Sequence, residues 1–377
     1  DALALIEKLK ETDPLEALVE KAEKKAEKKN PPLLYNLAEL QNDCSKLFKI
    51  SPDQTLSIVQ ELYEKKLVTY PRTDARVLSS AIAKEIYKNI KGLSVLSALK
   101  PAVDEILDKK LYQNIIKTKY VNDSAITDHF AIIPTGQGFS ALKGINQLNM
   151  RVYEVICRRF LAIFLPPAVY RKLSFILEIE KEKFFASDKY LTDPGYLKVM
   201  QYSFTKEKKQ QYSSPLDGIK KGMVLSAKKG DAGLYISALE IRESETSPPK
   251  RYTTGSIILA MENAGNLIED EELRAQIKGS GIGTSATRAE IIKKLVTNKY
   301  LELNKKTQII TPTLMGEMIH DVVAFSIKSL LNPELTASWE KGLSYVAEGS
   351  VTEDEYMIKL EDYIKKRTDA VKGLNNQ

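Results

Sequence analysis

The sequence predicts a multidomain α+β protein that is mostly helical and carries one β-rich domain. Its 377 residues exceed what a single hydrophobic core usually organises. Apolar residues follow helical spacing through most of the chain but alternate with polar ones after residue 166. The composition, 43% hydrophobic and 28% charged, is that of a folded globular chain. We therefore expect four parts, residues 1–36, 37–165, 166–250 and 251–377.

The first part, residues 1–36, is predicted to be a helical lead-in and the start of the β-rich arch domain. Lysines and glutamates crowd residues 21–29, and such a charge run is typical of the solvated face of a helix. The triplet Asn30-Pro31-Pro32 follows, and proline cannot continue a helix. We expect one helix that ends at this triplet.

The second part, residues 37–165, is predicted to be predominantly helical. Ser51 can cap a helix that has Pro52 at its first position. This helix should end near Lys66. The residues that follow, Leu67–Tyr70, are short and strand-like, and the proline after them breaks the strand.

The third part, residues 166–250, is predicted to be rich in β-strand. A period of two is typical of a strand and relates Leu173, Phe175, Leu177 and Ile179. A second strand is expected at Met223–Leu225. Pairs of prolines open and close the segment, and we therefore expect a separate β-rich domain.

The last part, residues 251–377, is predicted to be helical again. A helix is expected over 255–263 and another over 286–297. Apolar residues at 300–303 and 308–310 then flank a polar turn. A helix followed by a hairpin is the outline of a winged helix, which is a common DNA-binding shape. The same outline also serves as plain scaffold, and the residues alone favour neither reading.

The composition excludes several classes of protein. With two cysteines and two histidines, a disulfide framework or a Cys/His zinc site is not expected, and a reducing cytoplasm fits best. No run of about 18 apolar residues predicts a membrane span. The net charge of +6 permits nucleic-acid binding, although a lysine-rich solvated surface explains it equally well. The opening residues resemble neither a signal peptide nor an initiator sequence, so we expect an excised fragment or a chain that has lost its beginning.

The segment with the clearest chemistry is Thr69-Tyr70-Pro71-Arg72-Thr73-Asp74. A tyrosine hydroxyl becomes a nucleophile only when its proton is removed or its oxyanion is stabilised. Arg72 could place a planar guanidinium on a phosphate, where negative charge builds up during attack. In an extended chain Tyr70, Arg72 and Asp74 point the same way, so Asp74 could orient Arg72. By the residues alone, a buried tyrosine beside a surface ion pair remains the competing interpretation.

Three further segments, one before this hexapeptide and two after it, also carry distinctive sequences. They are residues 31–41 (Pro-Pro-Leu-Leu-Tyr-Asn-Leu-Ala-Glu-Leu-Gln), 128–135 (Asp-His-Phe-Ala-Ile-Ile-Pro-Thr) and 281–292 (Gly-Ile-Gly-Thr-Ser-Ala-Thr-Arg-Ala-Glu-Ile-Ile). Together with residues 69–74 they resemble the motifs of type IA DNA topoisomerases. The Pro-Pro-Leu-Leu segment and the Tyr-Pro-Arg-Thr-Asp form favour the topoisomerase III branch. The resemblance covers roughly residues 30–345 and implies a toroidal core with a β-rich arch at 166–250 and a helical gate at 37–165.

The resemblance also implies a role for particular residues. Tyr70 would be the nucleophile that attacks single-stranded DNA, while Arg72 and His129 would act on the scissile phosphate. Positions that would support the active site are Gln60, Glu64, Thr69, Thr73 and Asp74. Positions that would bind the DNA strand are Thr284, Thr287 and Arg288. A solvent-exposed helix face remains the competing interpretation for Gln60 and Glu64. For Arg288 it is simple exposure in the first turn of a helix.

Two features depart from the family pattern, and one element of it is missing. Ser285 stands where proline is usual, and Phe130 where many relatives have a second histidine. Family members bind Mg²⁺ through an acidic cluster in a TOPRIM domain, and no D-x-D-x-E motif occurs here. We therefore expect this chain to bind no metal itself and to depend on a missing TOPRIM domain for Mg²⁺.

The resulting expectation is a monomeric, cytoplasmic enzyme core that acts on single-stranded DNA and has no membrane segment. Three other classes stay open. The chain could be a single-stranded DNA-binding module without catalysis, or a purely structural scaffold. A tyrosine recombinase also attacks phosphate with tyrosine, but it needs several arginines and histidines around the site. The sequence offers one nearby arginine and two histidines in total.

Overall fold

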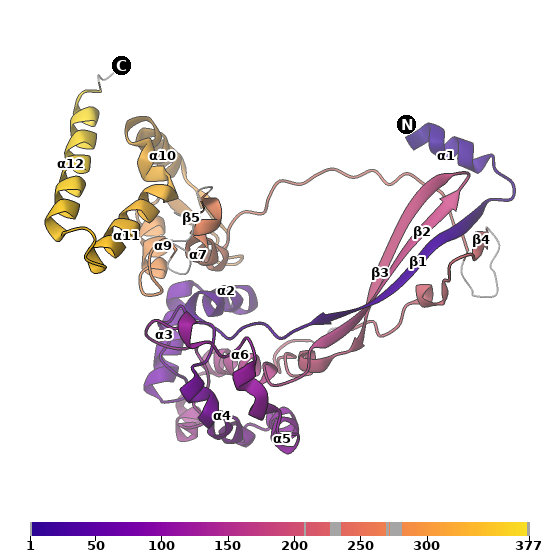
Figure 1. The fold of residues 1–377 in the computed structure, drawn as a ribbon, viewed down its shortest axis with the longest axis horizontal. Helices are drawn as coiled ribbons and strands as arrows, with labels where there is room; N and C mark the ends of the chain where they lie inside the picture. The colour runs from indigo at the N-terminus through magenta and orange to yellow at the C-terminus, as the bar shows by residue number, and fades with distance from the viewer. Residues whose placement is uncertain (1, 207–208, 227–234, 269–270, 272–280, 375–377) are drawn as a thin grey trace. The chain divides into compact units, whose positions relative to one another are not determined.

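The computed structural model describes residues 2–206, 209–226, 235–268, 271 and 281–374. The chain divides into two compact units, each assembled from separate stretches of sequence. The first comprises Asp1–Pro32, Leu93–Gln113 and Arg158–Pro249. The second comprises Leu33–Gly92, Asn114–Cys157 and Lys250–Gln377. The expected mixture of many helices with an antiparallel sheet is confirmed (Figure 1).

The first unit is built on a four-stranded antiparallel sheet with the order β3-β2-β1-β4. Figure 1 shows its three long strands as a twisted ribbon. The strands are β1 (Glu16–Lys29), β2 (Ala168–Ile179), β3 (Glu182–Asp193) and β4 (Val224–Ser226). Glu180 and Lys181 join β2 to β3 with φ values of 48° and 69°. Two positive φ values in a two-residue loop match the twist of the strands that they connect.

The prediction of one helix over the first 29 residues is wrong. Only α1 (Ala2–Lys10) is helical, and Glu16–Lys29 forms β1. Alanine, glutamate and lysine favour a helix in isolation, but tertiary context overrides such a preference. Here β1 pairs with β2 along its length, with Leu18 opposite Glu178, and buries Val19 in the core of the sheet.

The alternation predicted for the third part is confirmed in β2. Leu173 and Phe175 are buried in one cluster with Val19, Tyr190 and Ile219. The residues between them face the other side of the sheet, as a period of two requires. This unit also contains α5 (Lys100–Asp108).

The second unit is mainly helical. Its helices are α2 (Leu37–Phe48), α3 (Pro52–Glu64), α4 (Ser80–Gly92), most of α6 (Gln147–Ala162), α7 (Thr254–Glu262), α9 (Arg288–Thr297), α10 (Leu314–Ser326), α11 (Pro333–Ala347) and α12 (Glu353–Lys372). The predicted start of α3 is confirmed, since Ser51 Oγ accepts a hydrogen bond from the Gln54 amide at 3.1 Å and Pro52 opens the helix. The predicted outline of helix and hairpin is also present, because α9 leads into β5 (Leu301–Leu303) and β6 (Ile310–Pro312).

A close approach of two backbones joins α7 to α2. A Cβ atom on Gly255 would lie 2.7 Å from Cα of Asn42, so only glycine allows the helices to approach this closely. Ser45 on α2 lies beside Thr254, with their hydroxyl oxygens 3.5 Å apart. Thr254 in turn donates a hydrogen bond to Gln308 Oε1 at 2.9 Å. The packing fixes where α7 ends, and that end carries part of the site described below.

The two cysteines, Cys44 and Cys157, are both buried and are not joined in a disulfide. Burial raises the pKa of the Cys44 thiol well above its usual range. None of the helices within the described ranges is both long and apolar enough to cross a membrane.

Candidate active site around Tyr70

Tyr70 lies just beyond α3, in an irregular segment that runs beside residues 129–135. Val68 forms an isolated antiparallel bridge with Pro134. The rings of Tyr70 and His129 lie with their centroids 4.4 Å apart and their planes inclined by 44°. Tyr70 is half-buried and His129 is exposed, so a ligand in solvent can reach both. The structure thus brings together two residues that the sequence analysis assigned to one site.

Two threonines on either side of Tyr70 hold this arrangement. Thr69 accepts a hydrogen bond from the Ile133 amide at 2.9 Å and donates one to the Ala131 carbonyl at 3.1 Å. Thr73, only 4% exposed, donates its hydroxyl to the His129 carbonyl at 2.7 Å. Because both threonines bind the segment 129–133, which carries His129, the backbone positions the imidazole beside the tyrosine ring. Their predicted supporting role therefore has a geometric basis.

The end of α3 provides a third ring and a polar pair. Tyr63 meets Tyr70 edge-on, with centroids 5.5 Å apart and planes at 82°. Gln60 donates a hydrogen bond to Glu64 Oε1 at 3.2 Å on the solvent side of the helix. Residues 60, 63 and 64 share one side of α3, as their spacing requires. Gln60 and Glu64 thus lie on the same side of the helix as the ring that touches Tyr70.

Arg72 is exposed and forms no ion pair with any residue in the described ranges. The expectation that Asp74 orients Arg72 is therefore not met. Asp74 Oδ1 instead accepts a hydrogen bond from Arg288 Nη1 at 3.0 Å. The segment is irregular rather than an extended strand, so the alternation that would place residues 70, 72 and 74 on one side does not apply.

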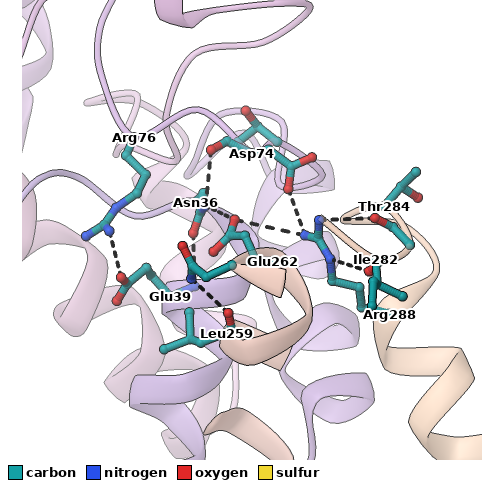
Figure 2. Close-up of polar contacts among 12 residues, drawn as sticks. Asn36, Glu39, Asp74, Arg76, Leu259, Glu262, Ile282, Thr284 and Arg288 are labelled. Atoms are coloured by element: carbon teal, nitrogen blue, oxygen red, sulfur yellow. Dashed lines mark hydrogen bonds and ion pairs between the residues drawn. The ribbon is translucent and has the colours of Figure 1, made fainter. Parts of the chain in front are cut away.

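Arg288 opens α9 and is only 1% exposed, although the sequence analysis placed it on the DNA strand. Its Nε donates to the Ile282 carbonyl at 3.2 Å, and its Nη2 donates to the Gly283 carbonyl at 3.1 Å. Figure 2 shows the guanidinium pointing from α9 toward Asp74. The side chain therefore lies among protein groups, which is the reverse of an exposed phosphate contact.

Two further residues complete this polar cluster (Figure 2). Asn36 Nδ2 donates to Glu262 Oε1 at 2.6 Å and to the Asp74 carbonyl at 3.1 Å. Glu262 Oε1 lies 3.9 Å from Arg288 Nη1. Burial raises the pKa of the Glu262 carboxyl, and the nearby Arg288 charge opposes that shift. One guanidinium thus lies between two carboxyl groups.

The segment before α9 carries the other predicted DNA contacts. Thr284 and Thr287 are exposed, and their hydroxyl oxygens lie 3.1 Å apart. Gly281 has a φ of +66°, and a Cβ on it would lie 2.4 Å from the Met261 carbonyl oxygen. Only glycine permits this approach, which sets the segment directly against the end of α7. The two threonines are accessible to a ligand, whereas Arg288 behind them is not.

The residues around Tyr70 do not make a metal site. In the described ranges, no group of three histidine, cysteine or acidic side chains is arranged to hold a metal ion. The carboxyl groups of Asp74 and Glu262 are taken up by Arg288 and Asn36. A hard cation such as Mg²⁺ needs converging oxygen ligands on a rigid frame, and these residues do not fit it.

Sequence reasoning missed three members of the site. Tyr63 follows Val59 and Leu62 at helical spacing in α3, and this pattern does not distinguish it from a core residue. Asn36 lay within a recognised segment, but no role was assigned to it. Glu262 ends an ordinary helix, and no signal in the sequence marks it.

Comparison with known proteins places the chain in a family. The family model described as DNA topoisomerase matches residues 1–358, and the chain belongs to that family. The resemblance to type IA enzymes of the topoisomerase III kind is confirmed by its relatives. DNA topoisomerase 3 of Bacillus licheniformis is 33% identical over 365 residues, covering 96% of this chain and 48% of that protein. DNA topoisomerase 3 of Bacillus subtilis is 34% identical over 370 residues, covering 97% and 48%.

A solved structure agrees with this assignment at the level of the fold. Full-length topoisomerase I from Thermotoga maritima superposes with a TM-score of 0.65 at 24% sequence identity. The match covers 98% of this chain and 54% of that protein. The chain spans about half the length of the curated relatives that it matches.

Proposed function

We propose that this chain is the core of a type IA DNA topoisomerase, in which Tyr70 cleaves and rejoins single-stranded DNA. The observation that carries the proposal is the contact between Tyr70 and His129, with ring centroids 4.4 Å apart. A nucleophile beside a group that can donate to phosphate is the minimum that transesterification requires. The break is transient, so one strand passes through another and relaxes or decatenates DNA without ATP.

The chemistry follows from the groups at hand. The Tyr70 oxygen attacks phosphorus and loses its proton, while the bond from phosphorus to the 3′ oxygen breaks. The products are a 5′-phosphotyrosine and a 3′-hydroxyl, which takes up a proton. Because the phosphoester energy is kept in the new bond, the reverse attack by the 3′-hydroxyl rejoins the strand.

Two exposed side chains would stabilise the charge that develops on the phosphate. Arg72 has a planar guanidinium without a competing ion pair in the described ranges, and it suits two phosphate oxygens at once. His129 can donate a hydrogen bond from its ring while Thr73 holds its backbone. Gln60 and Glu64 would border the same site from the end of α3.

The DNA strand would reach this site along the segment before α9. Thr284 and Thr287 present hydroxyl groups at the start of that helix, where backbone amides and the helix dipole favour phosphate. Such contacts fix the register of a strand without selecting its sequence. They suit an enzyme that acts on many DNA sequences.

Several parts of this function extend beyond the chain. The Mg²⁺ that family members use would be bound by a TOPRIM domain, as no described residues here are arranged to hold it. We further propose that residues 37–165 form the moving gate, residues 166–250 belong to the arch, and residues 251–377 help to bind DNA. A monomer in the cytoplasm is the proposed working form.

The test is a search for the covalent intermediate. The chain is mixed with a separately produced TOPRIM domain, Mg²⁺ and single-stranded DNA labelled at its 3′ end, then denatured. We expect labelled protein with the wild-type chain and none with Tyr70→Phe. A matched control is Tyr87→Phe on α4, which should label like the wild type. Equal labelling of Tyr70→Phe and wild type would refute the assignment of the nucleophile.

A second candidate function is single-stranded DNA binding without catalysis. The observation that favours it is the helix and hairpin of α9, β5 and β6, a shape found in DNA-binding proteins. In that case DNA binds with a clear dependence on salt, yet no adduct forms even with the TOPRIM domain present.

A further inference from the structure

We propose that Arg288 is a positioning residue, which locks the segment carrying Tyr70 to the segment carrying Thr284 and Thr287 and does not itself contact DNA. This inference rests on the proposed function. It assigns to a buried guanidinium the task of setting the distance between the bound strand and the nucleophile.

The donors of Arg288 are directed to both segments. Two of its nitrogens bind the Ile282 and Gly283 carbonyls, at 3.2 and 3.1 Å, and so brace the segment before α9. Nη1 donates to Asp74 at 3.0 Å and so reaches the segment after Tyr70. With 1% of its surface exposed, the side chain has no face left for a phosphate.

The contact at Asp74 leads directly to the site. Asp74 follows Thr73, whose hydroxyl binds the His129 carbonyl at 2.7 Å. The Asp74 carbonyl is held in turn by Asn36 at 3.1 Å. A shift of Asp74 would therefore move Thr73 and loosen the segment that sets His129 beside Tyr70.

The shape of the cluster explains why arginine stands at this position. The three contacts lie in different directions around one planar group, and a fork of fixed N–H donors can satisfy them together. A lysine would keep the positive charge but could not reach the two carbonyls and the carboxylate at once. Arg288→Lys is therefore the variant that separates geometry from charge.

The functional consequence is a fixed register of cleavage. A strand held by Thr284 and Thr287 meets Tyr70 at one phosphate only if the two segments stay at a constant distance. When the clamp is loosened, binding should persist while the phosphate presented to Tyr70 varies. Misplacement by about 1 Å is enough to slow an oriented reaction by roughly a hundredfold.

The first experiment asks whether Arg288 touches DNA. Affinity for a single-stranded oligonucleotide is measured against salt concentration for wild type, Arg288→Gln and Arg72→Gln. The slope of log affinity against log salt concentration should be unchanged in Arg288→Gln. In Arg72→Gln its magnitude should fall by about 0.7, because on single-stranded DNA each phosphate contact contributes about that much to the slope. A reduced slope in Arg288→Gln would overturn the proposal.

The second experiment asks whether Arg288 sets the register. Adduct formation with the added TOPRIM domain and Mg²⁺ is measured for Arg288→Lys, for Asp74→Asn and for the double variant. We expect each single variant to form adduct about tenfold to a hundredfold more slowly and to cleave at several neighbouring positions. The double variant should be no slower than the slower single one, because both remove the same contact.

These measurements distinguish a positioning role of Arg288 from a simple loss of stability, and a failure of this inference from a failure of the proposed function. A protein that is only less stable forms adduct more slowly at an unchanged position, so a single unshifted cleavage site in both variants refutes a positioning role. Asp74→Asn removes the ion pair but leaves the Arg288 hydrogen bonds to the Ile282 and Gly283 carbonyls in place, so it guards against loss of folding in Arg288→Lys. Absence of adduct in the wild type would refute the proposed function, and the inference with it. A normal wild type with unaffected variants would refute the inference alone.

Discussion

Tyr70 touches two other rings. That of Tyr63 comes from the end of α3, just before Tyr70 in the chain, and that of His129 comes from a distant segment. The Tyr63 ring meets it edge-on at 5.5 Å, and the His129 ring lies tilted at 4.4 Å. Tyr63 is 39% exposed, so it adds little to the core. Its contact can orient the Tyr70 ring, whose hydroxyl must be aligned with a phosphate in the reaction that we propose.

Removal of the Tyr63 ring should slow cleavage without unfolding the protein. An edge-to-face pair contributes about 0.5–1.5 kcal/mol. We therefore expect Tyr63→Ala to form adduct roughly two- to tenfold more slowly, with DNA affinity and melting temperature little changed. Tyr63→Phe keeps the ring and should behave like the wild type. Tyr87→Ala serves as the control, because Tyr87 is 40% exposed on another helix. Equal rates in Tyr63→Ala and Tyr87→Ala would contradict an orienting role.

Tyr70→Phe should leave stability intact. The Tyr70 hydroxyl makes no hydrogen bond to any residue in the described ranges, so its removal leaves no partner unpaired. We expect the free energy of unfolding to change by less than about 0.5 kcal/mol, and DNA affinity to be retained. Denaturant unfolding and oligonucleotide binding measure both. A large fall in stability would mean that the hydroxyl serves packing rather than reaction.

Thr73→Val should lower the free energy of unfolding, because it removes hydrogen bonds inside the segment that carries Tyr70. The variant keeps the shape of the side chain but leaves the part-buried His129 carbonyl and the buried Ala75 amide without the threonine hydroxyl. We expect a loss of about 1–3 kcal/mol in the free energy of unfolding. Thr73→Ser keeps the hydroxyl and should lose clearly less. If the valine and serine variants were equally stable, the hydrogen bonds would not be what holds this segment.

Glu262 should make the stability of the second unit depend on pH. Its folded pKa is raised by burial above the ordinary value of 4.5, so folding favours the protonated form. The stability from this group is fully present below pH 4.5 and is lost as pH rises through the folded pKa. Glu262→Gln cannot ionise, so its stability relative to the wild type should improve as pH rises over that window. Unfolding curves for both proteins at a series of pH values give the answer. Parallel pH profiles would show that Glu262 has no shifted pKa.

The helices of the second unit could be predicted from local sequence because their signals are local. Ser51 and Pro52 mark the start of α3 through groups within one turn, and the structure shows that cap at 3.1 Å. The strand β1 could not be predicted in the same way. Its residues favour a helix, and the partners that make it a strand, β2 and β4, come at least about 140 residues later in the chain.

The residues of the site also differ in whether local sequence is enough to identify them. Tyr70 and Arg72 stand out because the chemistry of attack on a phosphate needs those residue types close together. His129 was placed through family resemblance, since no spacing rule relates it to Tyr70. The pairing of Arg288 with Asp74 joins residues 214 positions apart. In the sequence an arginine at the start of a helix is equally suited to solvent, to phosphate or to a buried carboxylate, and only the folded chain distinguishes these cases.

Because both cysteines are buried, the surface of the native protein presents no thiol for chemical labelling. Cys44 and Cys157 are the chain's only thiols, both have 0% exposure, and the Cys44 thiolate is disfavoured by burial. Thiol-reactive dyes should therefore leave the native protein unmodified. A cysteine introduced at an exposed position, such as Lys84 or Lys293, would be the single point of attachment. Pairs of such positions would let fluorescence follow the distance between α4 and α9 during the proposed cleavage reaction, in a protein that keeps both native cysteines.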